Sequence, residues 1–180
     1  MNMYDYHREA QRTSPNDGHD KMDNALLGLI GETGELVDVI KKFLYQSSLN
    51  APLPWQKLQD ELGDVLWYLV ELAAGMDCQL AGLCGSFAQY DERAQKIKIM
   101  PSLKSVVVDM DKSAAALAEL ITKKRSFRIQ EEMNHMLKLC SYIARIAGTS
   151  LDKVADANIA KLKARYPEGF DSRISEARYE

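Results

Sequence analysis

The sequences GETGEL at Gly31–Leu36 and DELGD at Asp60–Asp64 indicate both the fold and the candidate site. Each lies in a segment with the 3.6-residue apolar repeat of an amphipathic helix, and each sets two acids three residues apart. Side chains at that spacing share one helix face. Two packed helices would therefore bring together four carboxylates, those of Glu32, Glu35, Glu61 and Asp64.

Helical periodicity continues outward from these stretches through most of the chain. Turn-forming residues separate the segments, among them Ser14–Gly18 and the two prolines of Asn50–Pro54. No stretch alternates like a strand, so we expect an all-α helical bundle in which residues 1–180 form one domain. The expected helices cover residues 4–12, 23–45, 55–74, 79–96, 103–124, 129–146 and 151–166.

The composition suits one compact soluble domain, and we expect a cytoplasmic location. The chain has 180 residues, of which 46% are hydrophobic and 27% are charged, and its formal charge is -3. No broad basic surface favours nucleic acid, and no apolar run reaches the roughly 20 residues that span a membrane. The first residues do not resemble a signal peptide, and three sparse cysteines indicate reduced thiols.

The two acidic helices are expected to pack through apolar stripes, with the acids on the flanks facing a shared groove. Gly28, Gly31 and Gly34 recur beside Glu35 although each costs a helix roughly 1 kcal/mol relative to alanine. This predicts a close approach to the helix backbone. The expected stripes are Leu26, Ile30, Leu36, Val37, Ile40 and Leu44 on the first helix, and Leu58, Leu62, Leu66, Leu69 and Ala73 on the second.

A carboxylate quartet is a hard-oxygen donor set. It suits Mg²⁺, with Mn²⁺ as an alternative, far better than Zn²⁺. Its charge exceeds what one ion needs, which allows two or three ions with a bound polyphosphate. Acid pairs at this spacing also occur on solvated helix faces, so a surface without a metal is the competing interpretation.

Three stretches resemble the MazG-type all-α nucleoside triphosphate pyrophosphohydrolases, whose acidic pattern is ExxE followed after a gap by ExxD. They are GLIGETGELVDVIKK at 28–42, DELGDVLWYLVELA at 60–73 and NIAKLKARYPEGF at 158–170. The resemblance covers residues 4–83 and 151–173. It implies Mg²⁺-dependent hydrolysis of a nucleoside or deoxynucleoside triphosphate to the monophosphate and pyrophosphate, in nucleotide-pool sanitation or control.

The resemblance also implies roles for individual residues. Glu32, Glu35, Glu61 and Asp64 would hold Mg²⁺, and either Glu32 or Glu35 would orient or deprotonate the attacking water. Many members have a third acid at the position of Gly31, which leaves the number of ions open. The expected substrate-binding residues are Asn158, Lys161 and Arg165, on one helix face, and Lys57, one turn before Glu61.

The chain also resembles itself, which suggests an intrachain pseudo-dimer. A shift of 71 residues places Glu61 on Glu132 and Asp64 on His135. A metal-binding half at about 24–84 would then be followed by a degenerate half at about 105–166, which carries the Asn/Lys/Arg segment. Helical periodicity alone can produce matches of this kind, so duplication and chance both stay open. The pseudo-dimer could stand alone or form a homodimer.

Two other functions compete with the hydrolase. A non-catalytic helical module could bind a nucleotide or a protein, although it would not need four convergent acids beside a cationic face. The Glu-x-x-His spacing of Glu132 and His135 occurs in di-iron bundles, but such sites need two copies of it. A solvated or hydrogen-bonded histidine explains the single copy.

Overall fold

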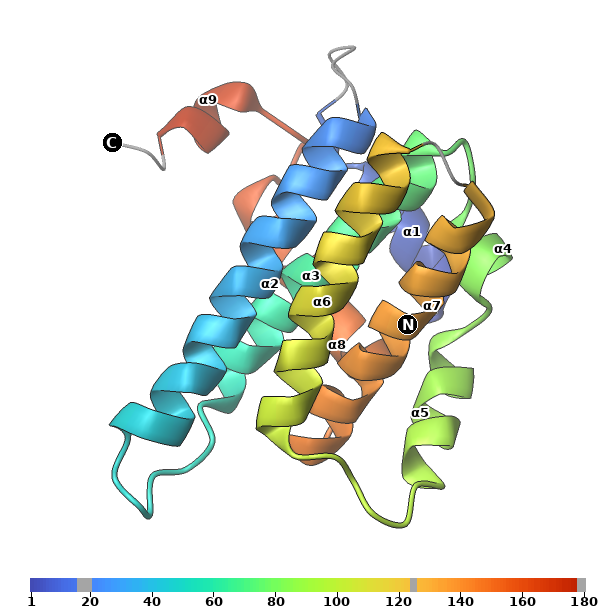
Figure 1. Cartoon of the computed structure of the whole chain (residues 1–180). Helices are drawn as coiled ribbons and strands as arrows, with labels where there is room; N and C mark the ends of the chain where they lie inside the picture. Colours follow the sequence, from blue (N-terminus) through green and yellow to red (C-terminus); the bar gives the residue numbers. More distant parts are fainter. Residues whose placement is uncertain (16–20, 124–125, 178–180) are drawn as a thin grey trace.

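The computed structural model describes residues 1–15, 21–123 and 126–177, and within these the regular structure is entirely helical (Figure 1). The predicted all-α class is confirmed. No helix in this described part of the chain is long and apolar enough to cross a membrane. The helices are α1 (Met3–Gln11), α2 (Lys21–Gln46), α3 (Trp55–Gly75), α4 (Leu80–Cys84), α5 (Phe87–Gln95), α6 (Leu103–Thr122), α7 (Ser126–Ile146), α8 (Leu151–Arg165) and α9 (Ser172–Glu176).

The core is a bundle of long helices in which α2 packs against both α3 and α6, and α6 packs against α7 (Figure 1). Two further helices cover this bundle, with α8 along α3 and α5 along α7. The α1 helix lies against α3, α4 and α8. Because α8 comes from the far end of the chain, its packing on α3 brings the C-terminal Asn/Lys/Arg segment to the acidic helix.

Each outer helix packs on one long hairpin, since α8 contacts α3 and α5 contacts α7. The α5 helix follows the α2–α3 hairpin in the chain but packs on α7, and α8 follows the α6–α7 hairpin but packs on α3. This arrangement agrees with the pseudo-dimer suggested by the sequence shifts. Packing of this kind does not by itself distinguish duplication from convergent bundle geometry, and the duplication stays a prediction.

One predicted helix was wrong, because the segment 79–96 forms two helices. Gly85 has a φ of 89°, which ends α4 in a conformation that only glycine adopts without strain. Ser86 then starts α5 with a capping box, in which its side chain accepts from Gln89 N. The five-residue α9 was not predicted, because it is too short to show an apolar period.

The predicted apolar stripe was right on α3 and partly wrong on α2. All five stripe residues of α3 are fully buried. On α2 the buried positions are Ala25, Leu29, Thr33, Leu36 and Ile40, whereas Ile30 is 42% exposed. The small residues Ala25 and Thr33 belong to the core face because α2 lies close to two neighbours, α3 and α6.

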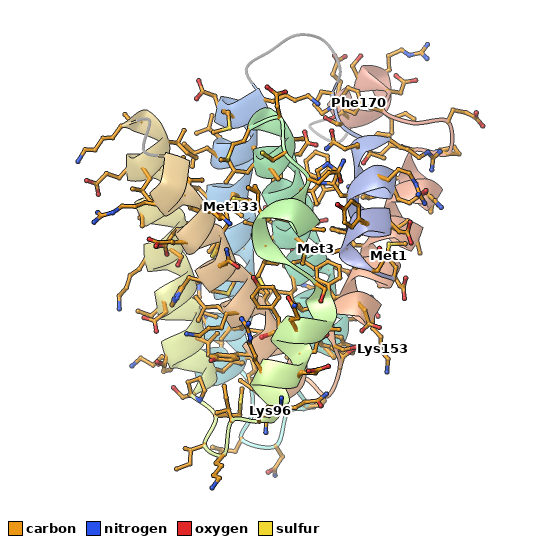
Figure 2. The ribbon with its side chains drawn as sticks, turned by 90° about the vertical axis from the view of Figure 1, so that its right-hand side faces the viewer. Met1, Met3, Lys96, Met133, Lys153 and Phe170 are labelled. Carbon is orange, nitrogen blue, oxygen red and sulfur yellow. The ribbon has the colours of Figure 1, made fainter. Side chains whose placement is uncertain are left out.

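The end of α1 and the segment that follows α8 are fixed near one another at one end of the bundle. Glu71 is fully buried on α3 and accepts hydrogen bonds from Ser14 Oγ at 2.8 Å and from Gln11 Nε2, which hold the end of α1. Phe170 N donates to Arg12 O at 3.1 Å. Figure 2 shows Phe170 at one end of the bundle and Lys96 at the other, so the C-terminal segment closes the end at which α1 finishes.

Candidate functional site

Three of the four predicted metal ligands converge. Glu32 on α2 and the pair Glu61 and Asp64 on α3 are half-buried, and one carboxylate oxygen from each lies within 4.8 Å of the others. The packing of α2 on α3 produces this convergence, because it turns the flanks of both helices toward one groove. The fourth predicted ligand, Glu35, is exposed one turn further along α2 and lies outside this group of three.

Burial, and after it the charges of neighbouring acids, raise the pKa values of two of these carboxyl groups. Burial raises the pKa of Glu32 from its ordinary value of 4.5 to about 7, and the charges of Asp64, Glu35 and Glu61 add to the increase. Burial also raises the pKa of Glu61, with contributions from Glu35 and Asp64. The positive charge of Lys161 opposes both increases. A further cation would lower the electrostatic cost of keeping these acids together.

The positive charge of Lys161 comes to the acids from α8. Lys161 Nζ lies 2.7 and 2.6 Å from the two oxygens of Asp64, and the two side chains are only 22% and 23% exposed. Asn158, one turn earlier, is buried and donates from Nδ2 to Asp64 Oδ1 at 3.0 Å. Two of the predicted substrate-binding residues therefore contact a predicted metal ligand.

Two cavities meet at Glu35, which lines both. One has a volume of about 490 Å³, contains Glu32, Asp64 and Arg165, and is bordered by aromatic side chains. The other has a volume of about 640 Å³, contains Glu61, Lys57 and Lys42, and runs along Gly31 and Gly34. The aromatic residues of the first cavity are Trp67, Tyr68, Tyr166 and Phe170.

The glycines of α2 divide into two groups. A Cβ atom on Gly28 would lie 1.9 Å from the ring of Tyr68, so the predicted close approach to the backbone is confirmed there, and it comes from within the chain. Gly31 and Gly34 have nothing within 4 Å of a Cβ position. These two glycines instead leave room at the wall of the second cavity.

Two contributors to the site were missed by the sequence analysis. A Cβ atom on Gly63 would lie 2.8 Å from Asn158 Cβ, so this glycine lets α8 approach α3. The hydroxyl of Tyr6 lies 2.9 Å from Asn158 Oδ1. The glycine within DELGD was a visible signal for a close contact, whereas nothing in the local sequence links Tyr6 to α8.

The di-iron alternative fails on geometry. Within the described ranges, the one group of three or more metal-ligating side chains is that of Glu32, Glu61 and Asp64. Glu132 instead accepts a hydrogen bond from Ser113 Oγ. The spacing of Glu132 and His135 is therefore not part of a metal centre in the described part of the chain.

A comparison with known families identifies the region that carries the acids. Residues 21–81 match the MazG nucleotide pyrophosphohydrolase domain. The resemblance seen in the sequence is thus confirmed for this segment, which contains all four predicted metal ligands and Lys57. The α8 residues that contact Asp64 lie outside the MazG match, as does Tyr6.

The comparison with curated proteins finds a phage relative. A protein described as Gene 37 protein of Mycobacterium phage L5 is 39% identical over 56 residues, which make up 31% of this chain and 49% of the relative. The chain thus spans about half the length of this relative. No solved structure matches the chain significantly.

Proposed function

We propose that this protein is a Mg²⁺-dependent nucleoside triphosphate pyrophosphohydrolase. It would hydrolyse a nucleoside or deoxynucleoside triphosphate to the monophosphate and pyrophosphate, in the sanitation or control of a nucleotide pool. The observation that carries the proposal is the convergence of Glu32, Glu61 and Asp64 beside Lys161, where two cavities meet. The MazG match over residues 21–81 supports it.

The donor set fits a hard divalent cation. Carboxylate oxygens are the side-chain ligands that Mg²⁺ and Mn²⁺ prefer. Burial of Glu32, together with the negative charges around it, raises its pKa, and a bound cation would offset both effects. Glu32, Glu61 and Asp64 would hold the metal, with Glu35 next to them. When bound, the metal supplies positive charge that stabilises the departing pyrophosphate.

The two cavities suggest how the substrate lies. The aromatic cavity suits a base and sugar, because flat rings stack on aromatic side chains. The terminal phosphates would occupy the second cavity, where Lys57 lies beside the acids and lysine is a point-charge phosphate ligand. Lys42 also lines this cavity, paired with Asp38. The scissile α-phosphate would then lie at the acids, within reach of Lys161 and Arg165.

Glu35 is the best-placed residue to act on the attacking water. It lies outside the group of three converging carboxylates, yet it borders both cavities. In the proposed reaction the water oxygen forms a bond to the α-phosphorus while the bond from that phosphorus to the bridging oxygen breaks. Pyrophosphate leaves with the bridging oxygen, and Glu35 accepts the proton of the water.

The test is a panel of ordinary and modified nucleotides with Mg²⁺, assayed for pyrophosphate and monophosphate. We expect release of both products in equal amounts, and an inactive Glu35→Gln variant with an unchanged helical circular-dichroism signal. Glu92→Gln, at an exposed position of α5, serves as the matched control. Absence of pyrophosphate from every nucleotide would reject the proposal, and nucleotide binding without hydrolysis would favour the non-catalytic module.

A further inference from the structure

A hydrogen-bond chain leads from α1 to the candidate metal centre. It starts at Tyr6, passes through Asn158 on α8 and ends at Asp64 on α3. We propose that Tyr6 is a positioning residue, which fixes the Asn158 amide and, through it, the orientation of the Asp64 carboxylate. This inference rests on the proposed function of the acidic cluster. It assigns to Asn158 the role of orienting the Asp64 carboxylate.

The distances between these atoms and the burial of the side chains make this series of hydrogen bonds well defined. The hydroxyl of Tyr6 lies 2.9 Å from Asn158 Oδ1, and Asn158 Nδ2 lies 3.0 Å from Asp64 Oδ1. Tyr6 is 0% exposed and Asn158 is 3% exposed. Solvent therefore cannot readily replace either partner, and a lost hydrogen bond would leave a buried polar group unsatisfied.

While Asp64 is ionised, the hydrogen bonds from Tyr6 through Asn158 to Asp64 can be donated in only one direction. A carboxylate only accepts hydrogen bonds, so the atom of Asn158 that faces it must be the donor Nδ2. The oxygen Oδ1 then faces Tyr6 and must accept, which makes the Tyr6 hydroxyl the donor. If the amide rotated by half a turn, its oxygen would face the carboxylate oxygen. The hydroxyl of Tyr6 thus selects the orientation that supports Asp64.

Packing holds the three residues in this arrangement. The Tyr6 hydroxyl also lies 3.2 Å from the carbonyl oxygen of Gly63, the residue before Asp64. Gly63 has no side chain to displace Asn158, whose Cβ would lie 2.8 Å from an added Cβ atom. The Tyr6 ring is tilted by 60° against Phe87 on α5, with centroids 5.7 Å apart. The position of Tyr6 is therefore set by helices from both halves of the chain.

This arrangement fixes one oxygen of the Asp64 carboxylate, Oδ1. Asp64 Oδ1 accepts from both Asn158 Nδ2 and Lys161 Nζ, so two donors from α8 define the plane of the group. Lysine is flexible and could follow a phosphate, whereas the buried amide of Asn158 cannot move far. Asn158 is thus the fixed support of Asp64, and Tyr6 holds it in place. Partners of this kind typically contribute 10–100-fold to metal affinity.

The first experiment measures binding of Mn²⁺ alone to the full chain, by electron paramagnetic resonance, for wild type and Tyr6→Phe. We expect roughly a 10-fold weaker affinity in the variant. Tyr90→Phe is a matched control, because that buried hydroxyl also contacts an asparagine oxygen, on Asn134, and a backbone carbonyl. Its loss should lower thermal stability to a similar extent while leaving the Mn²⁺ affinity unchanged.

A double-mutant cycle separates positioning from general destabilisation. Asn158→Ala should weaken Mn²⁺ binding at least as much as Tyr6→Phe, and adding Tyr6→Phe to it should have no further effect. Equal Mn²⁺ affinities of wild type and Tyr6→Phe, or fully additive losses, would overturn the inference. Should Tyr6→Phe fail to fold, Gly63→Ala displaces the same amide and must also weaken Mn²⁺ binding.

The outcomes distinguish this inference from the proposed function. A wild-type protein that binds Mn²⁺ but hydrolyses no nucleotide would refute the hydrolase and leave the positioning role to be decided by the cycle. An active wild type whose Tyr6→Phe variant retains full Mn²⁺ affinity would refute the positioning role alone. A wild type that binds no Mn²⁺ refutes the positioning role, whereas the hydrolase is decided by the release of pyrophosphate.

Discussion

Replacing Glu32 by glutamine should stabilise this protein when no divalent cation is present. Glu32 is held beside Asp64, Glu35 and Glu61, and its burial together with their charges raises its pKa to about 7. Glutamine has nearly the shape of protonated glutamate and carries no charge. The variant would therefore lose the cost of burying a charge and the repulsion from its neighbours, but also a metal ligand. Stability and metal binding should thus change in opposite directions.

The magnitude follows from the pKa. Each unit of difference between the folded and unfolded pKa corresponds to about 1.4 kcal/mol. The increase from 4.5 to about 7 gives an upper value of about 3 kcal/mol, and we expect about 1–3 kcal/mol because the groove is partly open to solvent. A folded pKa above the unfolded one means that the folded state binds the extra proton. Stability is therefore lost as the pH rises from 4.5 to about 7.

The assay is urea unfolding of wild type and Glu32→Gln in a chelator. At about pH 8 the variant should have the larger free energy of unfolding, and at about pH 4 the two should differ little, because Glu32 is then protonated in both states. Glu92→Gln, on the exposed face of α5, controls for the loss of a surface charge. Adding Mg²⁺ should stabilise wild type and leave the variant nearly unchanged.

A variant that is as stable as wild type or less stable at about pH 8 in chelator would refute this reasoning. It would show that neither burial nor the neighbouring acids make the charged form of Glu32 costly in the folded protein. A stabilisation that is equal at both pH values would also count against it, because the effect would not follow the titration of Glu32.

The remaining predictions concern the aromatic cavity, the cationic helix and the buried acid of α3. Gly28→Val should place its side chain in the ring of Tyr68, destabilise the protein by about 1–3 kcal/mol and raise KM for nucleotides in a steady-state assay. Lys161→Met should lower kcat/KM for nucleotides at least 10-fold, whereas Lys163→Met, on the exposed face of α8, should not. Glu71→Ala should cost about 2–4 kcal/mol in urea unfolding, because the buried hydroxyl of Ser14 and the half-buried amide of Gln11 lose their acceptor, while Mn²⁺ affinity should persist in the folded fraction.

The sequence predicted most reliably what local periodicity and spacing encode. The five stripe residues of α3 are all buried, because large apolar side chains recur there with a regular helical period. On α2 the core face includes Ala25 and Thr33, which look unremarkable in the sequence. Their burial depends on how closely the neighbouring helices approach α2, and that distance is a property of the assembled bundle. The break at Gly85 likewise depends on a backbone angle that apolar spacing does not report.

In the candidate site, too, some features could be predicted from the sequence and others could not. The convergence of Glu32, Glu61 and Asp64 could be predicted, because acids on the flanks of two packed helices can face one shared groove. The position of Glu35 outside that group could not, because a shift of one turn along α2 is enough to move it. The contribution of Tyr6 was also invisible, since it depends on α1 and α8 meeting across almost the whole length of the chain.

The most direct test of this account is a titration of Mn²⁺ into wild type and Asp64→Asn, followed by electron paramagnetic resonance. We expect saturable binding to wild type, and a loss of at least 10-fold in affinity when one of the three converging carboxylates becomes an amide. Absence of saturable binding to wild type, or equal affinity in the two proteins, would contradict the claim that α2 and α3 together form a cation site.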